Sequence, residues 1–146
     1  MGVLKEKSDQ NVASASTLIS SDAYSSSVHC SYYSCIQLML DIFHDHLLID
    51  KKALDTEFGK YKDEADSEIG FHNFYINKIR LEFLQRNKNF EEVQDLYGLL
   101  TQLKQKRVDA DYTEKIIGKK DSEKALTKAR RVIEYLSNTD FKTGKK

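Results

Sequence analysis

Apolar side chains recur at steps of three and four along most of this chain, which is the spacing of one helix face. The strongest pattern covers residues 22–47, where two apolar rows run side by side. The first row consists of Val28, Tyr32, Cys35, Met39 and Ile42, and the second of Ile36, Leu40, Phe43 and Leu47. A helix that is apolar on two sides is central to a bundle, or packs one side against a second subunit. The seven serines between residues 14 and 27 would let another helix approach closely.

A heptad-like row over residues 90–110 predicts a second core helix. Asn89 can cap its N-terminus, and Glu91 and Glu92 suit the positive end of the helix dipole. The row runs through Val93, Leu96, Leu100, Leu103, Arg107 and Ala110. It therefore places an arginine where the pattern requires an apolar residue.

Weaker patterns predict a first and a last helix. Ser8 or Asp9 can cap a first helix that continues to about residue 20. Asp121 or Ser122 can cap a last helix. The inward positions of the last helix are Ala125, Ala129, Val132, Ile133 and Leu136.

The pattern between these helices is mixed. Residues 71–86 are amphipathic, with an apolar row formed by Phe71, Tyr75, Ile79 and Phe83. Residues 50–69 are acidic and polar, with too little apolar content for a core helix, so we expect a short helix followed by a mobile loop. Residues 112–120 predict another loop.

The composition fits an all-helical domain. The chain has 146 residues, no proline and six glycines, so few residues interrupt helices. We therefore predict an all-α fold, an antiparallel bundle of about five helices in a single domain. Its core would span residues 8–138, and the tails at residues 1–7 and 139–146 would be frayed.

The charges balance overall but not along the chain. Lys plus Arg and Asp plus Glu both number 23, yet residues 97–146 contain 13 basic and 7 acidic residues. The basic half can attract nucleic acid or another acidic surface. Alternatively, the two ends of a bundle, or two protomers, are charge-complementary. The even spread of the lysines favours the second interpretation.

The sequence also indicates a compartment. Cys30 and Cys35 would lie about 140° apart around a helix, so they cannot bridge each other and are expected as buried, reduced thiols. The first residues, MGVLKEK, contain no apolar stretch typical of a signal peptide, and no run approaches transmembrane length. We expect a cytoplasmic protein with no membrane partner.

The segment LKQKRVDADY, residues 103–112, carries the clearest candidate chemistry. Arg107 occupies a seam position, where a guanidinium is costly to bury unless it is paired. Asp111 lies four residues further on the same face and can receive it. In one interpretation Arg107 lies at the bundle end, reaches solvent and makes that ion pair. In the other it points into a cleft at a dimer interface, ready to bind a phosphate.

Two segments together resemble the HEPN superfamily. In AYSSSVHCSYYSCIQLML, the residues Tyr32, Tyr33 and Ser34 resemble a Tyr-Tyr-Ala-like segment in the second helix of that family. LKQKRVDADY resembles the arginine motif that ends a later helix of the family. The resemblance covers roughly residues 15–138.

The resemblance implies a helical bundle, usually a homodimer whose composite cleft faces phosphate-bearing ligands. Its catalytic members are metal-independent ribonucleases, with an arginine followed four to six residues later by a histidine in each protomer. The arginine would stabilise the phosphorane charge, and the histidine would transfer the proton. In a toxin subclass, a nucleotidyltransferase partner modifies a tyrosine two residues beyond that histidine.

This sequence departs from that pattern at the histidine. Tyr112 stands five residues after Arg107, and Glu114 stands where the modified tyrosine would be. An ordinary tyrosine has a pKa of about 10, so it is a poor base at neutral pH. His29 and Tyr33 share a helix face, and if that face lines the same cleft, His29 could supply the imidazole from another helix. The alternative is a histidine that only satisfies a core or interface contact.

Other candidate sites are weaker. Asp41, His44 and Asp45 share a helix face and could touch a metal, but we expect this acidic segment to be exposed. Glu68 and His72 are four residues apart, with a glycine between them. The sequence contains no glycine-rich phosphate loop, CxxC pair or GxSxG motif. We therefore expect no metal and no cofactor.

The resulting expectation is a non-catalytic HEPN-like homodimer that binds nucleotide, RNA or a protein partner, such as a nucleotidyltransferase, near Arg107. The candidate ligand-binding residues are Arg107, Asp111, Tyr112, His29 and Tyr33. The alternative is a divergent ribonuclease of the toxin or defence type that uses Arg107 with Tyr112 or His29. A plain helical interaction module is a third hypothesis.

Overall fold

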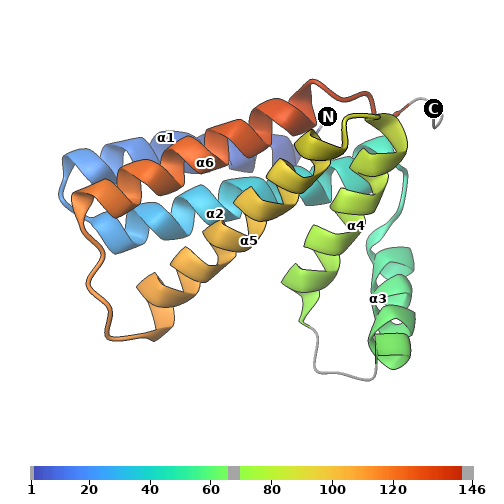
Figure 1. The fold of residues 1–146 in the computed structure, drawn as a ribbon, viewed down its shortest axis with the longest axis horizontal. Helices are drawn as coiled ribbons and strands as arrows, with labels where there is room; N and C mark the ends of the chain where they lie inside the picture. Colours follow the sequence, from blue (N-terminus) through green and yellow to red (C-terminus); the bar gives the residue numbers. More distant parts are fainter. Residues whose placement is uncertain (1, 66–69, 143–146) are drawn as a thin grey trace.

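The computed structural model describes residues 2–65 and 70–142, and their fold is all-α (Figure 1). The helices of these ranges are α1 (Val3–Ser20), α2 (Tyr24–Asp41), α3 (Lys51–Ala65), α4 (Phe71–Arg86), α5 (Phe90–Tyr112) and α6 (Lys119–Ser137), with a π-helical turn, η1 (Ile42–His46), after α2. The all-α prediction is confirmed, with six α-helices in the described ranges rather than about five. In Figure 1, α1, α2 and α6 lie side by side, α5 crosses them, and α3 and α4 stand at one end. The helices described here all lack the apolar length needed to span a bilayer.

α2 is the central helix, as its two apolar rows predict. It packs against α1, α4, α5 and α6. Val28, Tyr32, Cys35 and Met39 are fully buried. Each large apolar side chain buried this way contributes about 1.5–3 kcal/mol, so α2 holds the bundle together. Cys30, which we expected to be buried, is only half-buried, because it lies beside the apolar rows rather than in them.

α1 approaches α2 closely through small residues, as the serines predict. The buried residues of α1 are Ser8 and Ala15. The Ser8 hydroxyl donates to the Ser34 carbonyl at 2.7 Å, and the Ser27 hydroxyl donates to the Ala15 carbonyl at 2.8 Å. Ser31 is also fully buried on α2, but its hydroxyl has no hydrogen-bonding partner among the described residues. Small side chains and these two buried hydrogen bonds therefore join the two helices.

The helix ends show where capping was predictable. The Asn89 side chain accepts the backbone N–H groups of Glu91 and Glu92, so α5 begins at the predicted cap. α6 begins earlier than predicted, because Asp121 acts from inside its first turn and accepts the Gly118 N–H at 3.2 Å. At the other end of α5, Tyr112 belongs to the helix rather than to the predicted loop.

α3 is longer than the acidic sequence of residues 50–69 suggests. Leu54 is 2% exposed, and the Phe58 ring stacks on the Phe71 ring with centroids 4.1 Å apart. This narrow apolar stripe is sufficient because α3 packs mainly against α4. Phe71 is 46% exposed, so it does not belong to a core row as predicted. Residues 66–69 of the predicted loop lie outside the described residues.

Both predicted tails are in part structured. α1 begins at Val3, so residues 3–7 are helical rather than frayed. Phe141 is 1% exposed, and its ring centroid lies 5.2 Å from the Arg86 guanidinium carbon. This contact joins segments 55 residues apart, which no local pattern could predict.

The helix predicted over residues 22–47 changes from α-helical to π-helical hydrogen bonding near its C-terminal end. α2 stops at Asp41, and the Leu47 N–H then donates to the Ile42 carbonyl, five residues back, at 2.8 Å. Leu48 follows with a φ of 58° and a side chain that is 81% exposed. No proline or glycine marks this change in the sequence.

Candidate functional site

Arg107 lies near the C-terminus of α5 and faces α2. Its Nη2 donates to the Tyr33 hydroxyl at 2.8 Å and to the Tyr112 hydroxyl at 3.3 Å. Its Cζ lies 5.8, 5.3 and 5.1 Å from the ring centroids of Tyr32, Tyr33 and Tyr112. Each such cation–π contact contributes about 0.5–2 kcal/mol. We use the name arginine cluster for Arg107 and the side chains around it, which are Tyr32, Tyr33, Tyr112, His29, Asp111 and His72.

Asp111 links the two basic groups of the arginine cluster. Its Oδ2 lies 3.2 Å from Arg107 Nε and 2.8 Å from His29 Nδ1. The predicted Arg107–Asp111 ion pair is therefore confirmed. The Nε–H does not point along a hydrogen bond, so this contact is an attraction between charges without a directional bond. The Arg107 side chain is only 13% exposed, so it does not extend into solvent as one interpretation predicted.

His29 reaches the arginine cluster from α2. Its ring stacks on the Tyr33 ring with centroids 4.5 Å apart and an interplanar angle of 26°, as the shared helix face predicts. The imidazole is 46% exposed. Asp111 contacts Nδ1, whereas Nε2 has no hydrogen-bonding partner in the described part of the chain. A carboxylate that orients an imidazole in this way is a common arrangement for proton transfer.

His72 is a member of the arginine cluster that the sequence did not identify. It lies at the N-terminal end of α4, and its Nδ1 is 3.0 Å from the Tyr32 hydroxyl. Burial, and then the positive charges of Arg107 and Lys104, lower the pKa of His72, so the ring is neutral at pH 7. A neutral imidazole can accept a hydrogen bond from the Tyr32 hydroxyl at Nδ1. Burial raises the pKa of Tyr32 far above its ordinary value, which keeps this hydroxyl a donor.

The structure brings all five predicted site residues together in this one cluster. Arg107, Asp111 and Tyr112 come from one end of α5, and His29 and Tyr33 come from α2. No sequence spacing relates His72 to these residues, because α4 joins them only through tertiary packing.

The candidate metal residues lie elsewhere. Asp41 ends α2 and is 4% exposed, so the expectation of an exposed segment is wrong for Asp41, whereas Asp45 is exposed as expected. Its Oδ2 is 3.6 Å from His46 Nε2, whereas His44 bonds through Nδ1 to the Ile49 carbonyl at 2.6 Å. Among the described residues, no three His, Cys, Asp or Glu side chains are arranged to hold a metal ion. Glu68 lies outside the described residues.

A basic groove runs between α5 and α6. It has a volume of about 190 Å³, and three of the side chains that line it are lysines, Lys106, Lys124 and Lys128. Lys106 Nζ lies 3.5 Å from an Asp121 carboxylate oxygen, so that one of these charges is partly balanced. Lys106 and Arg107 are neighbours in α5 and project about 100° apart, so the groove and the arginine cluster flank the same helix.

The chain matches no protein-family model, no curated protein and no solved structure, so the geometry of the arginine cluster is the basis on which its function is inferred.

Proposed function

We propose that this chain is a HEPN-like cytoplasmic homodimer that binds a phosphate-bearing ligand, nucleotide or RNA, at the arginine cluster without cleaving it. The observation that carries the proposal is the state of the Arg107 guanidinium. The Tyr33 and Tyr112 hydroxyls accept from Nη2, and Asp111 lies 3.2 Å from Nε without a directional hydrogen bond. Nη1 has no hydrogen-bonding partner in the described part of the chain. A guanidinium that is held in advance loses little entropy when it binds a phosphate.

The surroundings of Arg107 support a nucleotide over a bare anion. Tyr112 is 68% exposed, and the stacked His29–Tyr33 pair lies beside the same guanidinium. Exposed aromatic rings stack on bases, with about 1–3 kcal/mol for each base. The basic groove on the adjoining side of α5 adds a positive field that attracts a nucleic-acid backbone.

Two features argue against cleavage. Tyr112 takes the position that the resemblance assigns to the histidine, and its hydroxyl is engaged by Arg107. Asp111 places a negative charge 3.2 Å from the same guanidinium, which reduces its ability to stabilise a developing phosphorane.

The test uses a fluorescein-labelled single-stranded RNA, with binding followed by anisotropy and cleavage by gel electrophoresis. Arg107→Ala is expected to weaken binding at least about tenfold, which corresponds to one charge-assisted contact. The control is Arg130→Ala, which removes an exposed arginine from α6 and should change binding less than about twofold. Equal binding by the wild type and a folded Arg107→Ala variant would refute the proposal. Analytical ultracentrifugation tests the homodimer.

A second function, a metal-independent ribonuclease, is favoured by one observation. Asp111 orients His29 within the arginine cluster, so an imidazole lies next to the guanidinium although α5 carries none. This alternative predicts that the wild type cleaves the labelled RNA, that His29→Gln binds it without cleaving it, and that expression of the wild type arrests growth. Binding with intact RNA, and normal growth, would exclude it.

A further inference from the structure

A strip of basic and aromatic side chains leads away from the arginine cluster where α4 packs against α5. We use the name α4–α5 strip for its members, Arg80, Tyr97 and Lys104. The Arg80 guanidinium of α4 lies over the Tyr97 ring of α5, with Cζ 5.1 Å from the ring centroid. Tyr97 is 38% exposed and Arg80 is half-buried, so this pair reaches the surface.

Lys104 connects the Arg80–Tyr97 pair to the arginine cluster. It lies seven residues after Tyr97, which is about two turns along one face of α5, and three residues before Arg107. Burial, Arg107 and then Lys104 lower the pKa of His72, so the charge of Lys104 acts on the arginine cluster. Tyr97 and Arg107 are about 15 Å apart along the helix axis, a distance that a strand spans and a single nucleotide does not.

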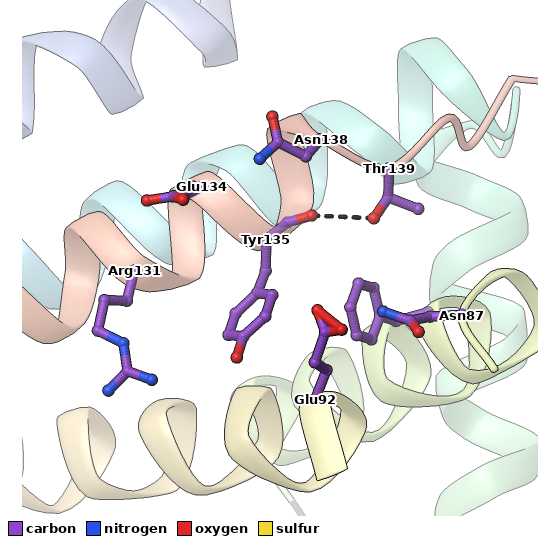
Figure 2. Close-up of a pocket in the computed structure, with 8 residues that line it drawn as sticks. Asn87, Glu92, Arg131, Glu134, Tyr135, Asn138 and Thr139 are labelled. Atoms are coloured by element: carbon purple, nitrogen blue, oxygen red, sulfur yellow. Dashed lines mark hydrogen bonds between the residues drawn. The ribbon is translucent and has the colours of Figure 1, made fainter. Parts of the chain in front are cut away.

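The positive charges of the α4–α5 strip are unbalanced. Among the described residues, neither Arg80 nor Lys104 has an ion-pair partner, and the buried Arg80 Nε has no hydrogen-bond acceptor. Removing such a group from water without a partner is costly, so an anion that binds there is favoured. The other side of α5 differs, because Arg131, which reaches from α6 toward α5 in Figure 2, is paired with Asp95. The α4–α5 strip therefore lacks the anion that the α6 side of α5 supplies from the protein itself.

We propose that the α4–α5 strip is a second subsite for a single strand of nucleic acid, one phosphate of which binds at the arginine cluster. Lys104 and Arg80 bind further phosphates of the strand, and a base stacks on the Arg80–Tyr97 pair. Aromatic rings and guanidinium planes both accept a stacked base, and an unpaired base is free to reach them. This inference rests on the function proposed above and narrows its ligand to a strand longer than one nucleotide.

The test is isothermal titration calorimetry of the full chain with uridine 5′-monophosphate, with oligouridine and with the corresponding oligodeoxyuridine. The wild type is expected to bind the strands at least about tenfold more tightly than the mononucleotide, because only a strand reaches the α4–α5 strip. A preference for either strand agrees with the proposal, and the ratio of the two affinities distinguishes RNA from DNA.

Variants of the α4–α5 strip should affect strands only. Arg80→Gln and Tyr97→Ala are each expected to weaken oligouridine binding about tenfold and to change mononucleotide binding less than about twofold. Tyr97→Phe keeps the ring and should bind like the wild type. Arg131→Gln removes the same charge from the α6 side of α5 and is the matched control, with less than about a twofold change for either probe.

The dependence of binding on salt separates a phosphate contact from a structural role. The slope of log affinity against log salt should become shallower by about 0.7 in Arg80→Gln and in Lys104→Gln, because each removes one phosphate contact, and should not change in Tyr97→Ala. The inference is overturned if Arg80→Gln and Tyr97→Ala, folded by circular dichroism, bind oligouridine like the wild type. Loss of binding in Arg107→Ala alone would give that result and leave the proposed function intact. If the wild type binds neither the mononucleotide nor the strands, the proposed function fails as well.

Discussion

Replacing Ser31 by alanine should make this protein more stable. Ser31 is fully buried on α2, and within the part of the chain that the structure describes its hydroxyl has no hydrogen-bonding partner. A buried hydroxyl without a partner costs about 1–3 kcal/mol, and alanine adds roughly 0.5 kcal/mol of helix propensity. The void left by one oxygen atom takes back about 0.5–1 kcal/mol. The expected net gain is about 0.5–3 kcal/mol, or a rise of roughly 2–10 °C in the melting temperature.

The matched control for this prediction is Ser27→Ala. Ser27 is equally buried on the same helix, but its hydroxyl donates to the Ala15 carbonyl at 2.8 Å. The same chemical change should therefore destabilise the protein by about 1 kcal/mol. Urea denaturation followed by far-ultraviolet circular dichroism measures both variants, with the midpoint compared at constant m-value. The reasoning is refuted if Ser31→Ala unfolds at a lower urea concentration than the wild type.

Three further predictions concern other parts of the fold. Because the pKa of His72 is lowered, the unfolded chain binds a proton that the folded chain does not. Stability should be highest above the unfolded pKa of about 6.5 and fall as the pH drops below it, and urea midpoints of His72→Gln should show a smaller fall. Leu48→Gly should raise the free energy of unfolding by about 0.5–1 kcal/mol, because a φ of 58° is strained for leucine and its side chain is exposed. An unchanged or lower urea midpoint would contradict this. Phe58→Ala removes the stack on Phe71, so amide hydrogen exchange should accelerate in α3 and not in α5. Equal acceleration in both helices would show that α3 does not open alone.

The sequence predicted those parts of the fold that depend on local repetition. The two apolar rows of α2 made its central position predictable, and Asn89 marked the start of α5. The fit of α3 depends on Phe58 meeting Phe71 across a chain reversal, and the burial of Phe141 depends on a helix far away in the sequence. Neither contact leaves a periodic signal in the sequence, so the predictions underestimated the length of α3 and the order of the C-terminal segment around Phe141.

In the arginine cluster, too, local spacing was predictable and contacts between separate helices were not. Arg107 with Asp111, and His29 with Tyr33, are each four residues apart on one helix, so spacing was enough to propose both pairs. The meeting of the two pairs follows from α5 crossing α2, which no spacing encodes. His72 was missed for this reason.

The contact between α1 and α2 has a consequence for the response to temperature. Its buried residues on α1 are a serine and an alanine, and two buried hydroxyl-to-carbonyl hydrogen bonds join the helices. Apolar burial weakens on cooling and carries a large heat-capacity change, whereas hydrogen bonds are favoured by enthalpy. α1 should therefore remain docked in the cold and detach on heating before the apolar core around α2 melts.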